Sequence, residues 1–112
     1  LTESVCTKLD KELTTPPGIY CQSVGSALVN AQGGKFPLNM SYHLVNFYDE
    51  KNDGLVCSSS FEWGEKYTFL TPEKERGISH GDMIDLNREN IDGFDVREYY
   101  VGLVNDLKER GL

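Results

Sequence analysis

The stretch "FDVREYYVGLVNDLKERGL", residues 94 to 112, carries the clearest secondary-structure signal in the sequence. Asp95 is a favourable N-cap, and Glu98 three residues later completes a capping box, in which each side chain bonds the other's free backbone N–H. Phe94 and Tyr99 are placed to form a hydrophobic staple around this cap. Apolar side chains then recur with helical spacing at Val96, Tyr100, Leu103, Val104 and Leu107. This stretch predicts an amphipathic helix.

Upstream of this helix, two short β-rich segments alternate with helical ones. "IYCQSV", residues 19 to 24, and "KYTFL", residues 66 to 70, predict strands because they are rich in β-forming residues and end near Gly or Pro. Helices are predicted over residues 1 to 13, where Leu or Val recurs every four positions, and over residues 37 to 48. The order helix, strand, helix, strand, helix predicts an α/β fold with a parallel sheet.

Two strands are too few for a complete parallel sheet, which is buried on both faces and paired along its edges. The sequence therefore predicts part of a larger α/β sheet, incomplete as a stand-alone fold. Such a part leaves apolar surface uncovered. We expect this surface on the Val96–Tyr100–Leu103–Leu107 side of the last helix and along the flanks of residues 19 to 24.

Composition and charge exclude several classes of protein. A length of 112 residues and a hydrophobic content of 38% fit one small globular unit. The net charge of −7 argues against nucleic-acid binding, and no apolar run is long enough for a transmembrane segment. Cys6, Cys21 and Cys57 are an odd number without metal-site spacing, which argues against a disulfide scaffold but leaves one bridge with one free thiol as an alternative. Any targeting segment is expected upstream of Leu1, so the sequence leaves the location, including secretion, open.

Two ionisable residues are the leading candidates for chemistry. Asp53 lies in an Asn-Asp-Gly turn, and His80 lies in the loop "RGISHGDM", residues 76 to 83, after the second predicted strand. Functional groups gather at the carboxyl ends of parallel strands, and a carboxylate makes an imidazole a useful base by fixing its tautomer. We therefore expect the two side chains to lie about 3 Å apart. The plainer alternative is that His80 is an ordinary surface residue.

The segments around this pair resemble the C-terminal end of bacterial triacylglycerol lipases. "NDGLVCSSSFEWG", "SHGDMIDL" and "DVREYYVGLVNDLKERGL" follow one another with similar spacing, and the likeness covers residues 50 to 112. The resemblance implies the C-terminal portion of an α/β-hydrolase sheet, with Asp53 as the acid and His80 as the base of a Ser–His–Asp triad. It also implies a serine esterase or lipase that cleaves acyl ester or lipid substrates, and a partner in the N-terminal remainder of the hydrolase.

The sequence departs from the lipase pattern at the nucleophile and at a metal site. A hydrolase nucleophile needs Gly-x-Ser-x-Gly, which does not occur here; Ser26, in "VGSAL", has glycine on one side only. We expect the nucleophile outside this chain and no activity from the 112 residues alone. The resemblance matches Asp82 to a ligand for Ca²⁺, which requires six or more oxygens. The expected place of a second acid, residues 31 to 34, holds none, so a hydrogen bond from Asp82 within its own loop is the alternative.

Other interpretations stay open at this point. The chain could be a small non-catalytic α/β module that binds a partner and uses its acid and histidine structurally, or one half of a two-chain or nicked hydrolase. Cys57 is expected as a buried structural thiol, and His43 as a core or rim histidine among the apolar residues of a helix. Asp49 and Glu50 are rival acids, and Asp53 is favoured because its turn fixes its direction.

Overall fold

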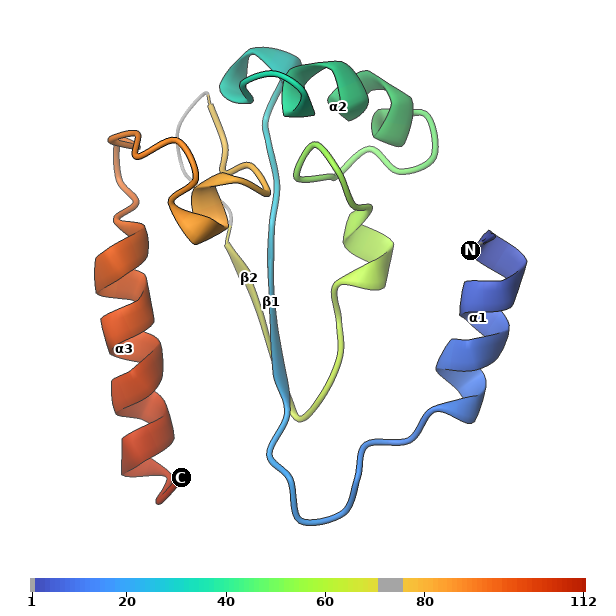
Figure 1. Cartoon of the computed structure of the whole chain (residues 1–112), viewed down its shortest axis with the longest axis vertical. Coiled ribbons are helices and arrows are strands. Elements are labelled where there is room, and N and C mark those ends of the chain that lie inside the picture. Colours follow the sequence, from blue (N-terminus) through green and yellow to red (C-terminus); the bar gives the residue numbers. More distant parts are fainter. Residues whose placement is uncertain (1, 71–75) are drawn as a thin grey trace.

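The computed structural model describes residues 2–70 and 76–112 and combines three α-helices with a two-stranded parallel sheet (Figure 1). In chain order the elements are α1 (Glu3–Glu12), β1 (Gln22–Ser26), the 3-10 turn η1 (Ala31–Gly33), α2 (Leu38–Asn46), the 3-10 turn η2 (Ser58–Ser60), β2 (Lys66–Leu70), the 3-10 turn η3 (Asp82–Ile84) and α3 (Val96–Glu109). The predicted alternation of helices and strands is confirmed, and the arrangement is loosely α/β.

The two strands pair in parallel from Gln22 opposite Lys66 to Ser26 opposite Leu70. Their carboxyl ends therefore lie at the same edge of the sheet. The segments of residues 49 to 57 and 76 to 85 lie near this edge (Figure 1). β2 has the predicted bounds, whereas β1 begins three residues later than predicted. The physical reason is that a strand needs a partner, and pairing starts only at the residue opposite the first residue of β2.

Asp95 caps the N-terminus of α3 as its sequence predicts, but among the described residues no hydrogen bond joins the Glu98 side chain to the Asp95 N–H. The Asp95 carboxylate accepts hydrogen bonds from the backbone N–H groups of Arg97 and Glu98, at 2.9 and 3.1 Å. The rings of Phe94 and Tyr99 lie 6.0 Å apart, centroid to centroid, on either side of this cap. The Asp95 half of the capping box and the hydrophobic staple are thus confirmed.

Buried residues gather beyond the carboxyl ends of the strands. Among the described residues other than glycine, the buried ones are Leu28, Tyr42, Ile78, Ser26, Asn52, Asp53, Ser79 and Asp82. They belong to the end of β1, to α2 and to the two loops that carry the candidate acid and histidine. The core of this chain therefore surrounds the candidate site, and more than half of its members are polar.

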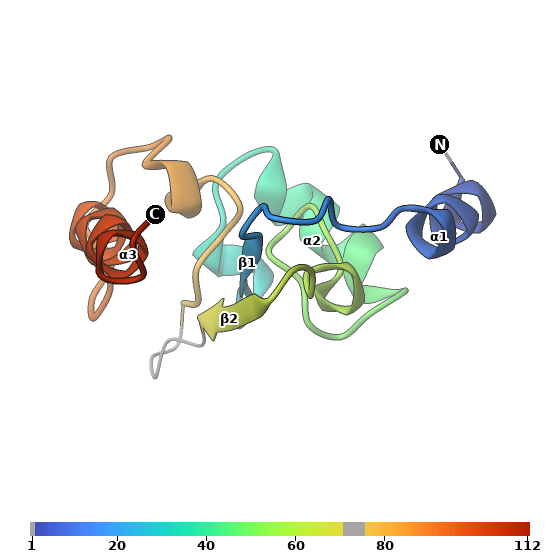
Figure 2. The same cartoon turned by 90° about the horizontal axis from the view of Figure 1, so that it is seen from below.

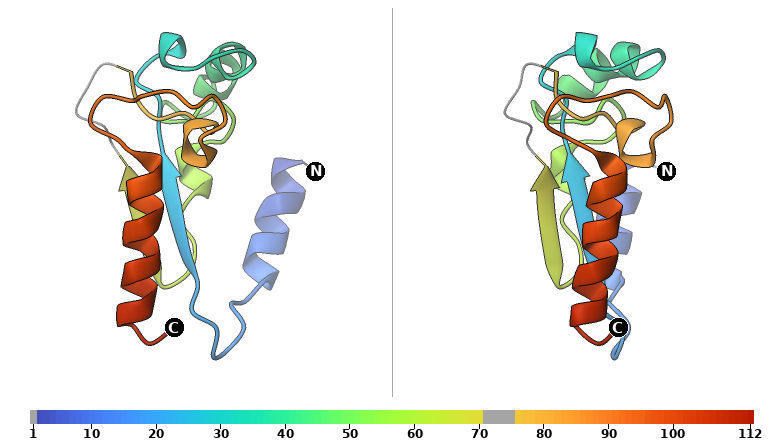
Figure 3. Two further views of the ribbon diagram at one scale, coloured as in Figure 1. Left: turned by 60° about the vertical axis from the view of Figure 1, so that its left-hand side comes forward. Right: turned by 90° about the vertical axis from the view of Figure 1, so that its left-hand side faces the viewer.

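Neither α1 nor α3 contains a fully buried residue. Every residue from 2 to 19, which includes α1, is exposed, and no residue of α3 is buried. α1 and α3 stand on opposite sides of the sheet (Figure 2), and α3 runs back alongside the strands (Figure 3). Polar contacts hold α3 there: Lys66 Nζ lies 3.0 Å from Asp106 Oδ2, and the Tyr100 hydroxyl donates to the Met83 carbonyl.

Apolar surface is uncovered, but the prediction that it lies on the Val96–Tyr100–Leu103–Leu107 side of α3 is wrong for three of these four residues. On α3, Tyr100 is exposed as predicted, whereas Val96, Leu103 and Leu107 are half-buried. The most open apolar side chains of this helix are Val101 and Val104, at 61% and 60%. Near the first strand, Ile19 is exposed. None of the helices in the described part of the chain is long and apolar enough to cross a membrane.

Candidate active site

Asp53 and His80 lie side by side, as the sequence predicts. His80 Nδ1 is 2.7 Å from Asp53 Oδ2, a short charge-assisted hydrogen-bond distance. The Asp53 side chain is 7% exposed and the His80 side chain 47%. The carboxylate is therefore shielded from water, while the imidazole remains accessible on its other side.

The acid is oriented by its own turn. Asp53 Oδ1 accepts hydrogen bonds from the backbone N–H groups of Leu55 and Val56, at 3.0 and 2.8 Å, so that Oδ2 is free for the imidazole. Gly54 has φ +95, and a Cβ there would lie 3.0 Å from the Leu38 carbonyl oxygen, which explains why glycine is needed at this position. The Asn-Asp-Gly turn thus directs the carboxylate, as predicted.

Backbone hydrogen bonds join the acid turn, the histidine loop and the end of β1. The His80 N–H donates to the Asp53 carbonyl, and the Leu28 N–H donates to the Asn52 carbonyl, each at 2.8 Å. Gly77, with φ +84, allows the histidine loop to approach so closely that a Cβ would lie 2.5 Å from the Leu28 Cα. The relative positions of acid and base are therefore set by main-chain contacts as well as by their own hydrogen bond.

Asp49, the main rival acid, has a different role. Its carboxylate accepts hydrogen bonds from the Ser59 N–H, the Lys51 N–H and the Ser58 hydroxyl. The backbone donors Ser59 and Lys51 are the largest causes that lower its pKa below the ordinary value. Asp49 therefore stabilises the turn before η2, and Asp53 is the acid beside the histidine.

The remaining candidate groups fit structural roles. Burial, and then the charges of Asp49 and Asp53, raise the pKa of the Cys57 thiol, which keeps it protonated and weakly nucleophilic. His43 is exposed on α2, with its ring edge-on to that of Tyr42 at 5.6 Å between centroids. Neither residue competes with His80 as a site for chemistry.

Ser26, the last residue of β1, does not present a usable nucleophile. It is 2% exposed, and its hydroxyl is buried without a hydrogen-bond partner among the described residues. A nucleophile has to reach its substrate, which a hydroxyl enclosed at the end of a strand cannot do. That the nucleophile lies outside this chain stays a prediction.

Asp82 binds an arginine that the sequence analysis did not single out. Arg76 Nη1 lies 2.7 Å from Asp82 Oδ2, Nη2 lies 3.2 Å from Oδ1, and the Ser79 N–H donates to Oδ2 at 2.8 Å. The alternative of a hydrogen bond within the loop is thus confirmed. Spacing alone offers no signal for the pair, because Arg76 and Asp82 meet only when the loop folds back on itself.

The surroundings of Asp82 do not fit a calcium ion. Both of its oxygens face the guanidinium of Arg76, whose charge replaces that of a cation. The described residues hold no group of three or more Asp, Glu, His or Cys side chains suited to a metal ion, and η1, where a second acid is expected, contains none. Calcium at Asp82 stays a prediction that metal titration can test.

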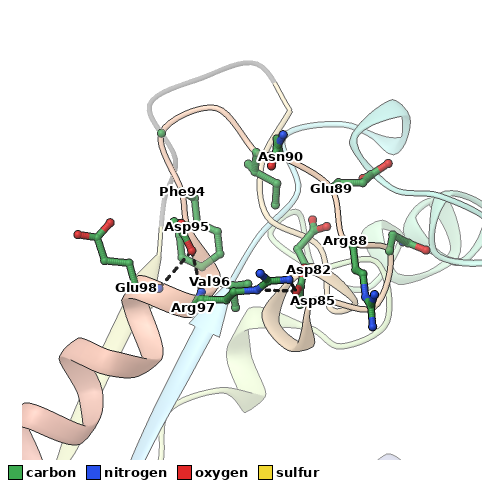
Figure 4. Close-up of a pocket in the computed structure, with 13 residues that line it drawn as sticks. Asp82, Asp85, Arg88, Glu89, Asn90, Phe94, Asp95, Val96, Arg97 and Glu98 are labelled. Atoms are coloured by element: carbon green, nitrogen blue, oxygen red, sulfur yellow. Dashed lines mark hydrogen bonds and ion pairs between the residues drawn. The ribbon is translucent and has the colours of Figure 1, made fainter.

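A cavity of about 450 Å³ lies beside the histidine loop, between η3 and the start of α3 (Figure 4). Neither Asp53 nor His80 lines it. Most of its lining side chains are charged or amide groups, whereas acyl-binding pockets are mostly apolar. Four of its five acids already have partners: Asp82 and Glu89 bind Arg76, Asp95 caps α3, and Asp85 Oδ2 pairs with Arg97 Nη2 at 2.9 Å. The chemistry therefore points to the Asp53–His80 pair, and this cavity is a neighbouring polar hollow.

No protein-family model, no curated protein and no solved structure matches this chain. The class of function is therefore inferred from the geometry of the Asp53–His80 pair and from the sequence segments around it.

Proposed function

We propose that this chain is the C-terminal part of a carboxylic ester hydrolase, similar to a triacylglycerol lipase, whose nucleophilic serine lies outside residues 1–112. The observation that carries the proposal is the 2.7 Å contact between Asp53 Oδ2 and His80 Nδ1 beyond the carboxyl ends of two parallel strands. The acid precedes the histidine in the chain, which is the order found in α/β-hydrolases.

In this proposal His80 transfers the proton, and Asp53 orients the imidazole and stabilises its positive charge. Asp53 accepts the Nδ1–H hydrogen bond, which leaves the lone pair of His80 on Nε2. Nε2 removes the hydroxyl proton of the serine as that oxygen attacks the ester carbonyl, and then donates it to the departing alkoxide. In the second half, Nε2 takes a proton from water, which attacks the acyl-enzyme, and returns it to the serine. The shielded carboxylate stabilises the imidazolium at both stages.

The uncovered surfaces of the chain support the same proposal. The outer edges of β1 and β2 pair with no other strand among the described residues, and α1 and α3 expose apolar side chains. A parallel sheet is normally paired along its edges and covered on both faces. The remainder of a hydrolase sheet, carrying the serine, would supply that cover.

The test uses the full-length protein that contains these residues, assayed with a short-chain p-nitrophenyl ester and a fluorophosphonate probe. We expect hydrolysis and labelling of one serine outside residues 1–112. His80→Ala should lower kcat on the order of 10⁴-fold or more, whereas His43→Ala, the matched control, should retain activity. The separate 112-residue chain should neither hydrolyse the ester nor take up the probe.

Two results would overturn the proposal. One is ester hydrolysis that survives His80→Ala, and the other is the absence of hydrolysis and labelling from the folded full-length protein. The second result would favour the non-catalytic partner-binding module instead.

A further inference from the structure

Four charged residues, two of them within the histidine loop, form a cluster. Arg76 lies at the centre, with its guanidinium on Asp82 at 2.7 and 3.2 Å and on Glu89 Oε2 at 2.5 Å. Lys35, from the segment between η1 and α2, forms an ion pair with the other oxygen of Glu89. We name this cluster the arginine clamp. It joins the two ends of the histidine loop to each other and to the chain after β1.

The clamp is buried most deeply at the residue nearest the histidine. The exposed fractions are 3% for the Asp82 side chain, 31% for Arg76 and 24% for Glu89. A buried carboxylate without a partner is strongly unfavourable, so Asp82 requires the guanidinium. Lys35 first, and then Arg76, lower the pKa of Glu89, which keeps this outer carboxylate charged.

The contacts of the clamp converge on His80. Asp82 Oδ2 accepts hydrogen bonds from Arg76 and from the N–H of Ser79, the residue directly before the histidine. The Arg76 carbonyl accepts from the Val29 N–H at 3.2 Å, so the backbone of the arginine is anchored as well. One carboxylate thus ties both sides of a short loop together, and the imidazole projects from the middle of that loop.

We propose that Arg76 is a positioning residue, whose two-pronged contact with Asp82 holds the histidine loop so that His80 stays in line with Asp53, without a metal ion. This inference rests on the proposed function. A guanidinium presents two parallel N–H donors to a carboxylate, whereas a lysine ammonium is a single point charge. Charge alone is therefore not sufficient, and Arg76→Lys is the informative variant.

The experiment compares Arg76→Lys with Arg97→Lys in the full-length protein. Arg97 is the matched control, because its Nε and Nη2 both contact Asp85 nearby but its side chain is 75% exposed and lies outside the clamp. Arg76→Lys should lower kcat about 10- to 100-fold with KM nearly unchanged, as a misplacement of about 1 Å can do. Arg97→Lys should leave both constants unchanged, and a chelator should not affect the wild type.

A second readout does not depend on catalysis. The proton shared between His80 Nδ1 and Asp53 should give a low-field NMR signal in the wild type and in Arg97→Lys, and a broadened or missing one in Arg76→Lys. Glu89→Gln, which removes only the outer charge, should weaken the signal less and serves if Arg76→Lys fails to fold. If ester hydrolysis is absent, this signal still tests the clamp, so the two proposals fail separately.

Three outcomes would overturn the inference. The first is a folded Arg76→Lys variant with unchanged kcat and an unchanged low-field signal. The second is a loss of activity that merely follows the loss of folded protein, with a normal signal from the molecules that remain folded. The third is inactivation of the wild type by a chelator and recovery with Ca²⁺, which would assign the bracing of the loop to a metal ion.

Discussion

The loops beyond the carboxyl ends of the strands and the helices beside the sheet are held in opposite ways. The loops contain most of the buried residues described, and both buried carboxylates among them are paired within the chain: Asp53 with His80, and Asp82 with Arg76. α1 and α3 have no buried residue and expose apolar side chains such as Val104. The candidate site is therefore held together by contacts within this chain, whereas the apolar faces of the outer helices remain exposed.

The largest expected effect concerns the contact between Asp53 and His80 in the loops. Asp53→Asn in the full-length protein keeps the shape of the turn but removes the charge that fixes the imidazole tautomer, and kcat should fall by about 10⁴-fold. Asp49→Asn is the matched control and should stay within a few-fold, because the Asp49 carboxylate binds Ser58 and Ser59 of η2 and does not contact the histidine. Steady-state kinetics measure both. Equal losses from the two variants would show that the Asp53–His80 contact has no special role.

The exposed apolar side chains of α1 and α3 predict how the separate 112-residue chain behaves in solution. Because apolar side chains on α1 and α3 lack cover, this chain should self-associate or bind a hydrophobic dye in solution. Val101→Lys with Val104→Lys, at the two most open apolar positions of α3, should reduce both effects. Light scattering and dye fluorescence measure them. A monodisperse wild-type monomer that unfolds cooperatively would show that the chain is a finished domain.

Gly77 and Gly93 differ in how closely other backbone atoms approach them. Both have positive φ, +84 at Gly77 and +82 at Gly93, but only Gly77 has backbone atoms within 2.6 Å of the place a Cβ would occupy. Gly77→Ala should lower the free energy of unfolding by about 3 kcal/mol, from strain and overpacking together. Gly93→Ala should cost about 1 kcal/mol, from strain alone. Denaturant unfolding of the full-length protein measures the difference, and equal costs would contradict the close packing of the histidine loop.

The smallest expected effect concerns the cap of α3. Asp95→Ala removes the acceptor for the N–H groups of Arg97 and Glu98 and should destabilise the protein by about 1 kcal/mol. Asp95→Asn keeps a side-chain oxygen in the same place and should be nearly neutral. Thermal unfolding checks the pair. A neutral Asp95→Ala would mean that α3 is held by its outer contacts rather than by its cap.

How far the sequence predicts each region follows from the distance along the chain between the groups involved. The cap of α3 joins Asp95 to residues two and three positions later, so it is visible in a short window. The Asp53–His80 contact spans 27 positions, and it was predicted because parallel strands bring their carboxyl ends together. The start of β1 was placed too early, since its pairing depends on where β2 begins.

The sequence by itself determined the helices and strands, the direction of the Asp53 carboxylate in its turn and the pairing of Asp53 with His80. These features depend on local hydrogen bonds or on a general rule of sheet geometry. Only the tertiary structure decided that Asp82 is held by Arg76, that Glu89 and Lys35 extend the cluster, and that Val101 and Val104 are the most open apolar residues of α3. Ion pairs and exposure depend on which distant segments fold against one another, and no spacing along the chain encodes that directly.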